Sequence, residues 1–237
     1  LFREAMPLTP IYALAHTLGD LGAVSAVDAL EASDAVALVH TRGKLMSDAC
    51  KAQDVGMLVS LGLDDETVEK LCQDARDAGS QVWAVNYNSD GQIVIAGMKD
   101  DLVALEPILK EAGARRAMLL NMSVASHCPL LQSAQEPFKA ELEKVIKEPF
   151  TAPVISNVTA KPYNSAAEAL TLLPEQLVKP VLYKQSIQAI DNEVDCYIEF
   201  GHGNVLKGLN KKLTKKPHFN ISNMDTLEKT IEALKEL

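Results

Sequence analysis

The sequence predicts an α/β protein in which a small subdomain is inserted into a larger domain. Short apolar runs of strand length alternate with stretches of helical periodicity along the 237 residues, which is the pattern of an α/β chain. Hydrophobic residues make up 47% of the sequence and charged residues 23%, as in a globular protein with a buried core. A chain of this length forms one large domain or two modest ones.

The first elements of the larger domain are predicted over residues 1–55. The apolar run Thr9–Ala15 has the length of a buried strand, and the turn His16–Gly19 follows it. Residues 20–30 are rich in alanine and valine and predict a buried helix. A second helix is expected over residues 33–51, where apolar side chains recur at helical spacing.

The inserted subdomain is predicted over residues 56–121. Strands are expected at 57–63, 81–87, 92–96 and 117–120, with helices at 64–79 and 99–113. The segment Asn88–Gly91 joins the two middle strands and carries a strong hairpin signal. The resulting order, βαββαβ, is the ferredoxin-like arrangement.

The larger domain is expected to combine residues 1–55 and 122–237 around a parallel sheet. Near its end, residues 194–200 predict a strand, followed by a glycine turn and a helix. Asn204 is the predicted N-cap of that helix.

Charge and cysteine content exclude several classes of protein. The 23 Lys and Arg residues against 32 Asp and Glu residues give a net charge of −9, which argues against nucleic acid and anionic membranes as partners. No apolar run approaches the roughly 20 residues of a membrane span. The four cysteines form no CxxC pair, so we expect free thiols and a cytoplasmic location. We expect no metal and no bound cofactor. Because the chain starts with Leu1 rather than methionine, we expect a fragment of a longer protein.

The pentapeptide Ala15-His16-Thr17-Leu18-Gly19 is a candidate nucleophile elbow. It lies between a predicted strand and a predicted helix, and Ala15 and Gly19 supply the small residues that such a turn needs on either side of its nucleophile. Thr17 is then the candidate nucleophile. The alternative is an ordinary strand–turn–helix connection, which is the commoner origin of such a pentapeptide.

Two further residues could complete a site for acyl chemistry. His127 follows a predicted strand within Ser123–Cys128 and could act as a general base for a distant hydroxyl nucleophile; the alternative is a histidine that only makes a hydrogen bond within its loop. Arg42 lies in an apolar helical pattern, and its planar guanidinium suits a carboxylate ligand. A structural salt bridge is the alternative for Arg42.

Six motifs in fixed order are more specific than any of these residues alone. They are Ala15–Asp20, Arg42–Met46, Asn86–Gly97, Ser123–Cys128, Pro153–Val158 and Glu199–Leu209. Through them the chain resembles the malonyl-CoA:acyl carrier protein transacylases of fatty acid biosynthesis and, more distantly, the acyltransferase domains of polyketide synthases. The resemblance departs from the family in having Thr17 for the family's serine and Ala15 for its first glycine.

The resemblance implies an α/β-hydrolase-like larger domain and a two-step transfer of malonyl. The acyl group passes from malonyl-CoA to the nucleophile and then to the phosphopantetheine thiol of acyl carrier protein. By motif, Thr17 is the nucleophile and His127 the base, while the backbone N–H of Leu18 faces the oxyanion. The backbone carbonyl of Gln176 orients the histidine, and Arg42 binds the free malonyl carboxylate.

The resemblance also implies contacts with the substrate and with the carrier protein. His16 and Asn88 are predicted to contact the acyl substrate. Lys207, Lys211 and Lys215 recur every four residues and are predicted to dock the acidic acyl carrier protein; a solvated helix face is the alternative.

Other classes of function are weighed against the transacylase. The family has an upstream Gly-Gln-Gly-Ser-Gln loop that completes its oxyanion hole, and this chain does not contain it. Together with Thr17, this motivates the alternative of a catalytically impaired fragment or relative that acts as a non-catalytic module. A serine-type esterase is weaker, because nothing in an esterase calls for Arg42.

Overall fold

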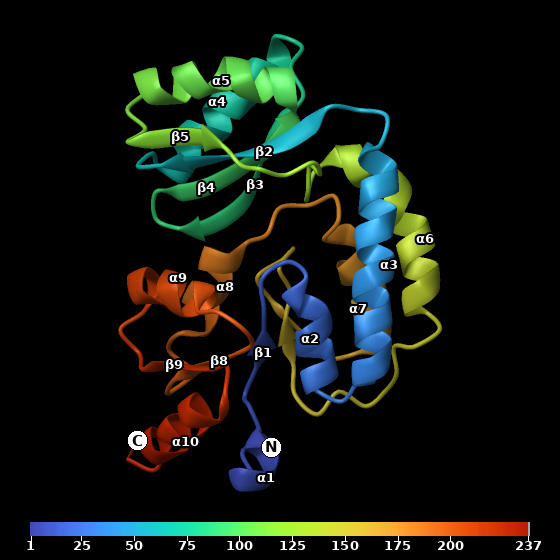
Figure 1. The fold of residues 1–237 in the computed structure, drawn as a ribbon, viewed down its shortest axis with the longest axis vertical. Coiled ribbons are helices and arrows are strands. Elements are labelled where there is room, and N and C mark those ends of the chain that lie inside the picture. Colours follow the sequence, from blue (N-terminus) through green and yellow to red (C-terminus); the bar gives the residue numbers. More distant parts are fainter. Residues whose placement is uncertain (237) are drawn as a thin grey trace.

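An antiparallel sheet with two helices on one face forms one end of the computed structural model, which describes residues 1–236 (Figure 1). In chain order its elements are β2 (Val55–Leu61), α4 (Asp65–Asp77), β3 (Val82–Ser89), β4 (Gln92–Met98), α5 (Lys99–Glu111) and β5 (Arg116–Leu119). The strands lie in the order β3-β4-β2-β5, and each neighbouring pair is antiparallel. The sequence predicts these six elements in this order, with bounds that differ by at most two residues.

Local chemistry explains these elements. Asp64 caps α4, since its carboxylate accepts a hydrogen bond from the Thr67 N–H at 2.7 Å, and acidic residues fill the positive first turn of that helix. Strands β3 and β4 approach so closely that a Cβ at Gly97 would lie 2.0 Å from the Gln81 carbonyl oxygen. Only glycine fits there.

The rest of the chain packs below this sheet in Figure 1. Its first half comprises α1 (Phe2–Ala5), β1 (Ala13–Leu14), α2 (Gly19–Ala26), α3 (Ala32–Cys50), the 3₁₀ helix η1 (Pro129–Ala134), α6 (Gln135–Leu142), β6 (Val154–Ile155) and β7 (Pro162–Tyr163). Its second half comprises α7 (Ala166–Glu175), α8 (Tyr183–Ile190), β8 (Tyr197–Phe200), α9 (Val205–Leu213), β9 (His218–Ile221) and α10 (Met224–Leu234).

Within residues 1–236, the expected parallel sheet is reduced to two parallel strand pairs in separate sheets. Strand β1 pairs with β6 in the three-stranded sheet β1-β6-β7, and β8 pairs with β9. The strand predicted over Thr9–Ala15 shrinks to Ala13–Leu14, because residues 7–11 are exposed and Pro10 has no N–H to offer a ladder.

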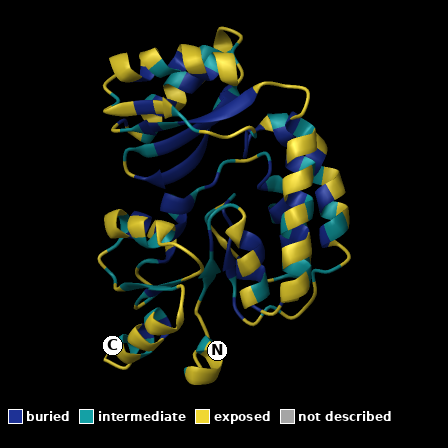
Figure 2. Cartoon of the chain, in the orientation of Figure 1, coloured by how far each residue is buried: buried dark blue, intermediate teal, exposed yellow. Residues whose placement is uncertain are grey.

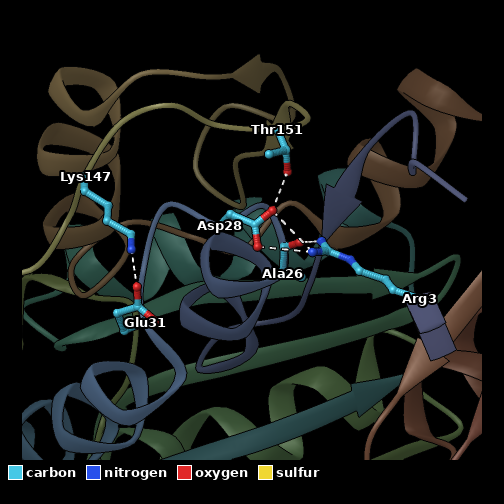
Figure 3. Close-up of polar contacts among 6 residues, drawn as sticks. All are labelled: Arg3, Ala26, Asp28, Glu31, Lys147 and Thr151. Atoms are coloured by element: carbon cyan, nitrogen blue, oxygen red, sulfur yellow. Dashed lines mark hydrogen bonds and ion pairs between the residues drawn. The ribbon is translucent and has the colours of Figure 1, made fainter. Parts of the chain in front are cut away.

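The helix predicted over residues 20–30 ends at Ala26. Asp28 has a φ of +64°, which a helix does not tolerate. Side chains from elsewhere fix this turn (Figure 3): Arg3 donates to the Ala26 carbonyl and pairs with the Asp28 carboxylate at 3.1 Å, and the Thr151 hydroxyl donates to the same carboxylate at 3.2 Å. The ion pair of Lys147 with Glu31 lies beside them.

Helix α3 carries a charged side chain into the interior. Its buried positions recur every four residues, at Leu38, Arg42, Met46 and Cys50, and it packs against η1 and α6. The opposite face is exposed along its length (Figure 2). The amphipathic pattern of α3 therefore places the Arg42 guanidinium inside the larger part of the molecule.

Within residues 1–236, no helix is long and apolar enough to cross a membrane. The four cysteines are free thiols, as the sequence predicts; three are buried and Cys196 is half-buried.

Candidate active site

Thr17 occupies a sharp turn between β1 and α2. Its φ is +58°, a left-handed conformation that is strained for a β-branched residue. The turn is tight, since a Cβ at Gly19 would lie 2.9 Å from the Ala15 Cβ. The small residues that the sequence places at positions 15 and 19 are therefore sterically required by this geometry.

The hydroxyl of Thr17 lies between two histidine rings. Its Oγ1 is 3.1 Å from His127 Nε2 and 3.0 Å from His16 Nδ1. His127 also has a positive φ, +64°, and is 1% exposed. The structure thus brings together three residues that the sequence predicts for the site, although His127 lies 110 positions from Thr17.

Hydrogen-bond partners fix the tautomer of each ring. His127 Nδ1 lies 2.5 Å from the Gln176 carbonyl oxygen, and His16 Nε2 lies 2.7 Å from Asn88 Oδ1. Both oxygens only accept, so these nitrogens carry the protons. His127 Nε2 and His16 Nδ1 are then both acceptors, and the single proton of the Thr17 hydroxyl is donated to one of them at a time.

Burial keeps both rings neutral near pH 7. Burial is the largest cause that lowers the pKa of His127 to about 3, and the positive charge of Arg42 lowers it too. The hydrogen bond to the Gln176 carbonyl has the opposite effect, because it favours the charged ring. Burial also lowers the pKa of His16. A neutral imidazole that faces a hydroxyl is the form that a general base requires.

Gln176 follows α7 and connects most of the site. Its side-chain Nε2 donates to Asp20 Oδ2 at 2.5 Å and to the Thr17 carbonyl at 3.0 Å. Its Oε1 accepts from the Arg42 guanidinium at 3.1 Å. The resemblance implies a role only for the backbone carbonyl of Gln176, whereas in the structure the side chain makes four further contacts, the fourth to Asn157 Oδ1 at 3.3 Å.

Asp20 is a buried site residue for which the sequence predicted no role. It is 3% exposed, and burial raises the pKa of its carboxyl to about 7, while the hydrogen bond from Gln176 and the charge of Arg42 oppose that shift. Its Oδ1 has no hydrogen-bond partner in the part of the chain described. The available signal was its place as the last residue of the motif Ala15–Asp20.

Arg42 is buried without a salt bridge to any of the described residues. It is 5% exposed, and burial lowers its pKa to about 10, opposed by the nearby charge of Asp20. The neutral side-chain amide of Gln176 lies between Arg42 and Asp20, accepting from Arg42 through Oε1 and donating to Asp20 through Nε2. The structural salt bridge considered for Arg42 is therefore not formed within residues 1–236.

Two cavities meet at His127. One of about 200 Å³ lies beside Thr17, and its walls include His16, Asn88, Met57 and Leu120. The other, of about 640 Å³, lies along α4 and β3, where Trp83 and Tyr87 contribute to its wall. Both histidines, Asn88 and Thr17 thus face one small cavity. No group of three or more His, Cys, Asp or Glu side chains in residues 1–236 could hold a metal ion.

The remaining predicted site residues make no hydrogen bond to the Thr17 hydroxyl within residues 1–236. Leu18 directly precedes α2 and is 43% exposed. Lys207 and Lys211 lie on α9, but Lys215 does not continue their helical stripe, because α9 ends at Leu213 and Thr214 is extended. Asn204 occupies the N-cap position without a side-chain cap; Glu199 instead accepts the N–H groups of residues 206 and 207, both at 3.0 Å.

A hydroxyl at a strained strand–helix turn, with a buried neutral base, defines a site for nucleophilic acyl transfer. The chain belongs to the acyl transferase domain family, whose model matches residues 4–229.

The most similar curated relatives include two malonyl CoA-acyl carrier protein transacylases. The protein of Salmonella typhimurium is 38% identical over 205 residues, which cover 86% of this chain and 66% of the relative. The protein of Bacillus subtilis is 36% identical over 237 residues, which cover 99% of this chain and 74% of the relative. The chain thus spans between 66% and 74% of the length of these two relatives.

Solved structures resemble the whole chain. The malonyl-CoA:acyl carrier protein transacylase of Helicobacter pylori superimposes with a TM-score of 0.93 at 44% identity, covering 97% of this chain and 73% of that one. A malonyl-transacylase in complex with the acyl carrier protein of a type II polyketide synthase gives a TM-score of 0.93 at 32% identity, covering 98% and 75%.

The buried neutral state of His127 predicts a stability that depends on pH. The pKa of His127 falls from 6.5 to about 3 on folding, so between these values the unfolded chain binds the extra proton. The contribution of His127 to stability is complete above pH 6.5 and is lost as the pH falls toward 3, by about 1.4 kcal/mol per pH unit.

Urea unfolding of the wild type and of His127→Gln between pH 4 and 8 measures this effect. The difference in unfolding free energy should shrink as the pH falls below 6.5. The pKa of Asp20 is raised, which gives the opposite slope, but Asp20 is common to both proteins. The exposed His40→Gln variant is the control. A wild-type to His127→Gln difference that is constant with pH would contradict the prediction.

Proposed function

We propose that this chain transfers a malonyl group from malonyl-CoA to the phosphopantetheine thiol of acyl carrier protein, for fatty acid biosynthesis. The observation that carries the proposal is the 3.1 Å contact between Thr17 Oγ1 and Nε2 of the neutral His127 ring. Gln176 connects this pair to the buried Arg42, because its backbone carbonyl accepts from His127 and its side chain accepts from the Arg42 guanidinium. Relatives named as transacylases at 36–38% identity support it.

The first half-reaction forms an ester on Thr17. The hydroxyl gives its proton to His127 Nε2 as Oγ1 attacks the thioester carbonyl carbon. The tetrahedral intermediate then expels the CoA sulfur, which takes the proton back from the imidazolium. The backbone N–H of Leu18 would stabilise the oxyanion, and it makes no hydrogen bond within residues 1–236.

The second half-reaction reverses these roles. His127 removes the proton of the carrier thiol, the sulfur attacks the ester carbonyl, and Thr17 leaves with the proton that the imidazolium returns. The hydrogen bond from His127 Nδ1 to the Gln176 carbonyl keeps the ring in the tautomer that both steps require.

Arg42 would select acyl groups that bear a free carboxylate. A guanidinium matches a carboxylate with two parallel hydrogen bonds, and Arg42 is buried where such a bond is least screened by water. His16 and Asn88 line the cavity beside Thr17 and are proposed to contact the acyl group.

Acyl carrier protein would dock on the basic residues around α9. Lys207 and Lys211 lie on that helix, Lys215 follows it, and none of the three forms a salt bridge with the described residues. The similar transacylase solved with an acyl carrier protein supports a partner of this kind. We propose no further cofactor, and the cytoplasmic location stays a prediction.

The architecture is proposed to consist of two parts. Residues 56–121 would form a ferredoxin-like subdomain, supported by the antiparallel strand order β3-β4-β2-β5 and by a hydrophobic core of its own. Residues 1–55 and 122–237 would form the α/β-hydrolase-like domain that carries Thr17, supported by the strand–turn–helix at that residue.

A second candidate function is a non-catalytic module of the same family. The β-branched Thr17 favours it, because the extra methyl group crowds a strained turn.

Intact-protein mass after incubation with malonyl-CoA separates the two candidates. The transacylase predicts one covalent malonyl increment on the wild type, none on Thr17→Ala, and faster labelling of Thr17→Ser, because serine relieves the crowding at φ +58°. Peptide mapping locates the label. If neither the wild type nor Thr17→Ser acquires the increment at long times, the transacylase proposal is wrong for this chain and the module is favoured.

Substitution of Arg42 should change acyl selectivity. Arg42→Ala should slow malonyl transfer roughly 10- to 100-fold, since a charged hydrogen bond is lost, while acetyl transfer changes little. Arg42→Lys should recover part of the malonyl rate, because it restores the charge without the planar fork. The exposed Arg116→Ala is the control. Equal losses with malonyl-CoA and acetyl-CoA would contradict this role.

Charge reversal on α9 tests the carrier surface. Lys207→Glu with Lys211→Glu should raise the KM for acyl carrier protein several-fold and weaken its salt dependence, while self-acylation by malonyl-CoA is unchanged. The double variant Lys229→Glu with Lys235→Glu, two exposed residues on α10 and at its C-cap, controls for the same change in net charge. An unchanged KM for the carrier in the double variant would place the docking surface elsewhere.

A further inference from the structure

We propose that Asn157 is a positioning residue that holds Thr17 in its strained conformation and thereby aims the Thr17 hydroxyl at His127. Its side-chain Oδ1 accepts the Thr17 N–H at 2.7 Å, and its Nδ2 donates to the Ala15 carbonyl at 2.8 Å. Asn157 is 1% exposed. Asn157 takes no part in the proton transfers proposed for Thr17 and His127.

The amide of Asn157 acts as an extra residue of the neighbouring strand. Strand β6 pairs in parallel with β1, in the register Ala13 with Val154 and Leu14 with Ile155. The backbone ladder stops there, because the chain turns sharply at Thr17. A carboxamide carries the same donor and acceptor as a peptide group, so the Asn157 side chain bonds residues 15 and 17 where the strand no longer can.

The side-chain amide of Gln176 binds the other backbone group of Thr17, its carbonyl. Gln176 Nε2 donates to the Thr17 carbonyl at 3.0 Å and lies 3.3 Å from Asn157 Oδ1. The N–H and the C=O of Thr17 are thus each held by a buried amide. With both fixed, the direction of its Cα–Cβ bond is fixed, so Oγ1 is restricted to the few positions of the staggered χ1 rotamers, one of which lies 3.1 Å from His127 Nε2.

The backbone of Asn157 is anchored independently of its side chain. Its carbonyl accepts the Leu182 N–H at 2.8 Å, and Val154 and Ile155 before it are fully buried. Truncation of the side chain therefore leaves the segment in place and removes the two bonds to the turn. A displacement of about 1 Å at a nucleophile can slow a reaction ~10²-fold.

The test compares Asn157→Ala with a variant that loses stability elsewhere. Leu109→Ala removes a fully buried side chain from α5 in the small sheet region, away from the site. Single-turnover acylation with malonyl-CoA gives the saturating rate and the half-saturating concentration. Hydrogen exchange of the Thr17 amide reports the Asn157 bond directly and needs no substrate.

We expect Asn157→Ala to lower the saturating rate ~10²-fold with little change in the half-saturating concentration, and to speed exchange of the Thr17 amide. Leu109→Ala should lower the melting temperature and leave both readouts unchanged. In a His127→Ala background, Asn157→Ala should cost little further rate, because Asn157 acts through the alignment of Thr17 with that ring.

The kinetic arm rests on the proposed function, and the exchange arm does not. Absence of acylation in the wild type and in Thr17→Ser would overturn the proposed function only. Unchanged Thr17 exchange in a folded Asn157→Ala protein would overturn the role of Asn157. So would a wild-type saturating rate in that variant.

Discussion

The site depends on Gln176, which acts through two different amides. Its backbone carbonyl accepts from His127 and leaves the Nε2 lone pair facing Thr17. Its side-chain amide lies between the carboxylate of Asp20 and the guanidinium of Arg42. The carbonyl that determines which His127 nitrogen is basic and the amide that contacts Asp20 and Arg42 therefore belong to one residue. Movement of Gln176 would disturb both at once.

Strain is concentrated where the chemistry is proposed. Thr17 and His127, two of the four non-glycine residues with positive φ in residues 1–236, face each other across 3.1 Å. Such conformations persist only where the surroundings determine them. Here two buried residues hold these turns: Asn157, which follows β6, accepts the Thr17 N–H, and Gln176, which follows α7, accepts from His127. Their side chains lie 3.3 Å apart although the residues are distant in sequence. The hydrogen bonds from the surrounding α/β scaffold therefore stabilise both strained conformations.

Sequence patterns predicted the features that are determined by a single segment of the chain. The helix expected over 33–51 is found at Ala32–Cys50, and the elbow lies at Thr17 because small neighbours permit a tight turn. Asp20 and Asn157 escaped prediction because their partners lie on other elements, which periodicity does not detect. The stripe through Lys215 failed for a local reason, since α9 ends at Leu213 two residues before Lys215 and four before Pro217.

The electrostatics of Arg42 connect the fold to acyl selectivity. A buried guanidinium is costly unless a charged partner compensates it. Among the described residues its hydrogen-bond partner is the neutral Gln176 Oε1, with the Asp20 carboxylate, whose pKa is about 7, one bond beyond. A malonyl carboxylate would give Arg42 the charge-assisted partner that an amide oxygen does not. An acetyl group offers no such gain, so in the proposed reaction the fold itself favours the dicarboxylic acyl group.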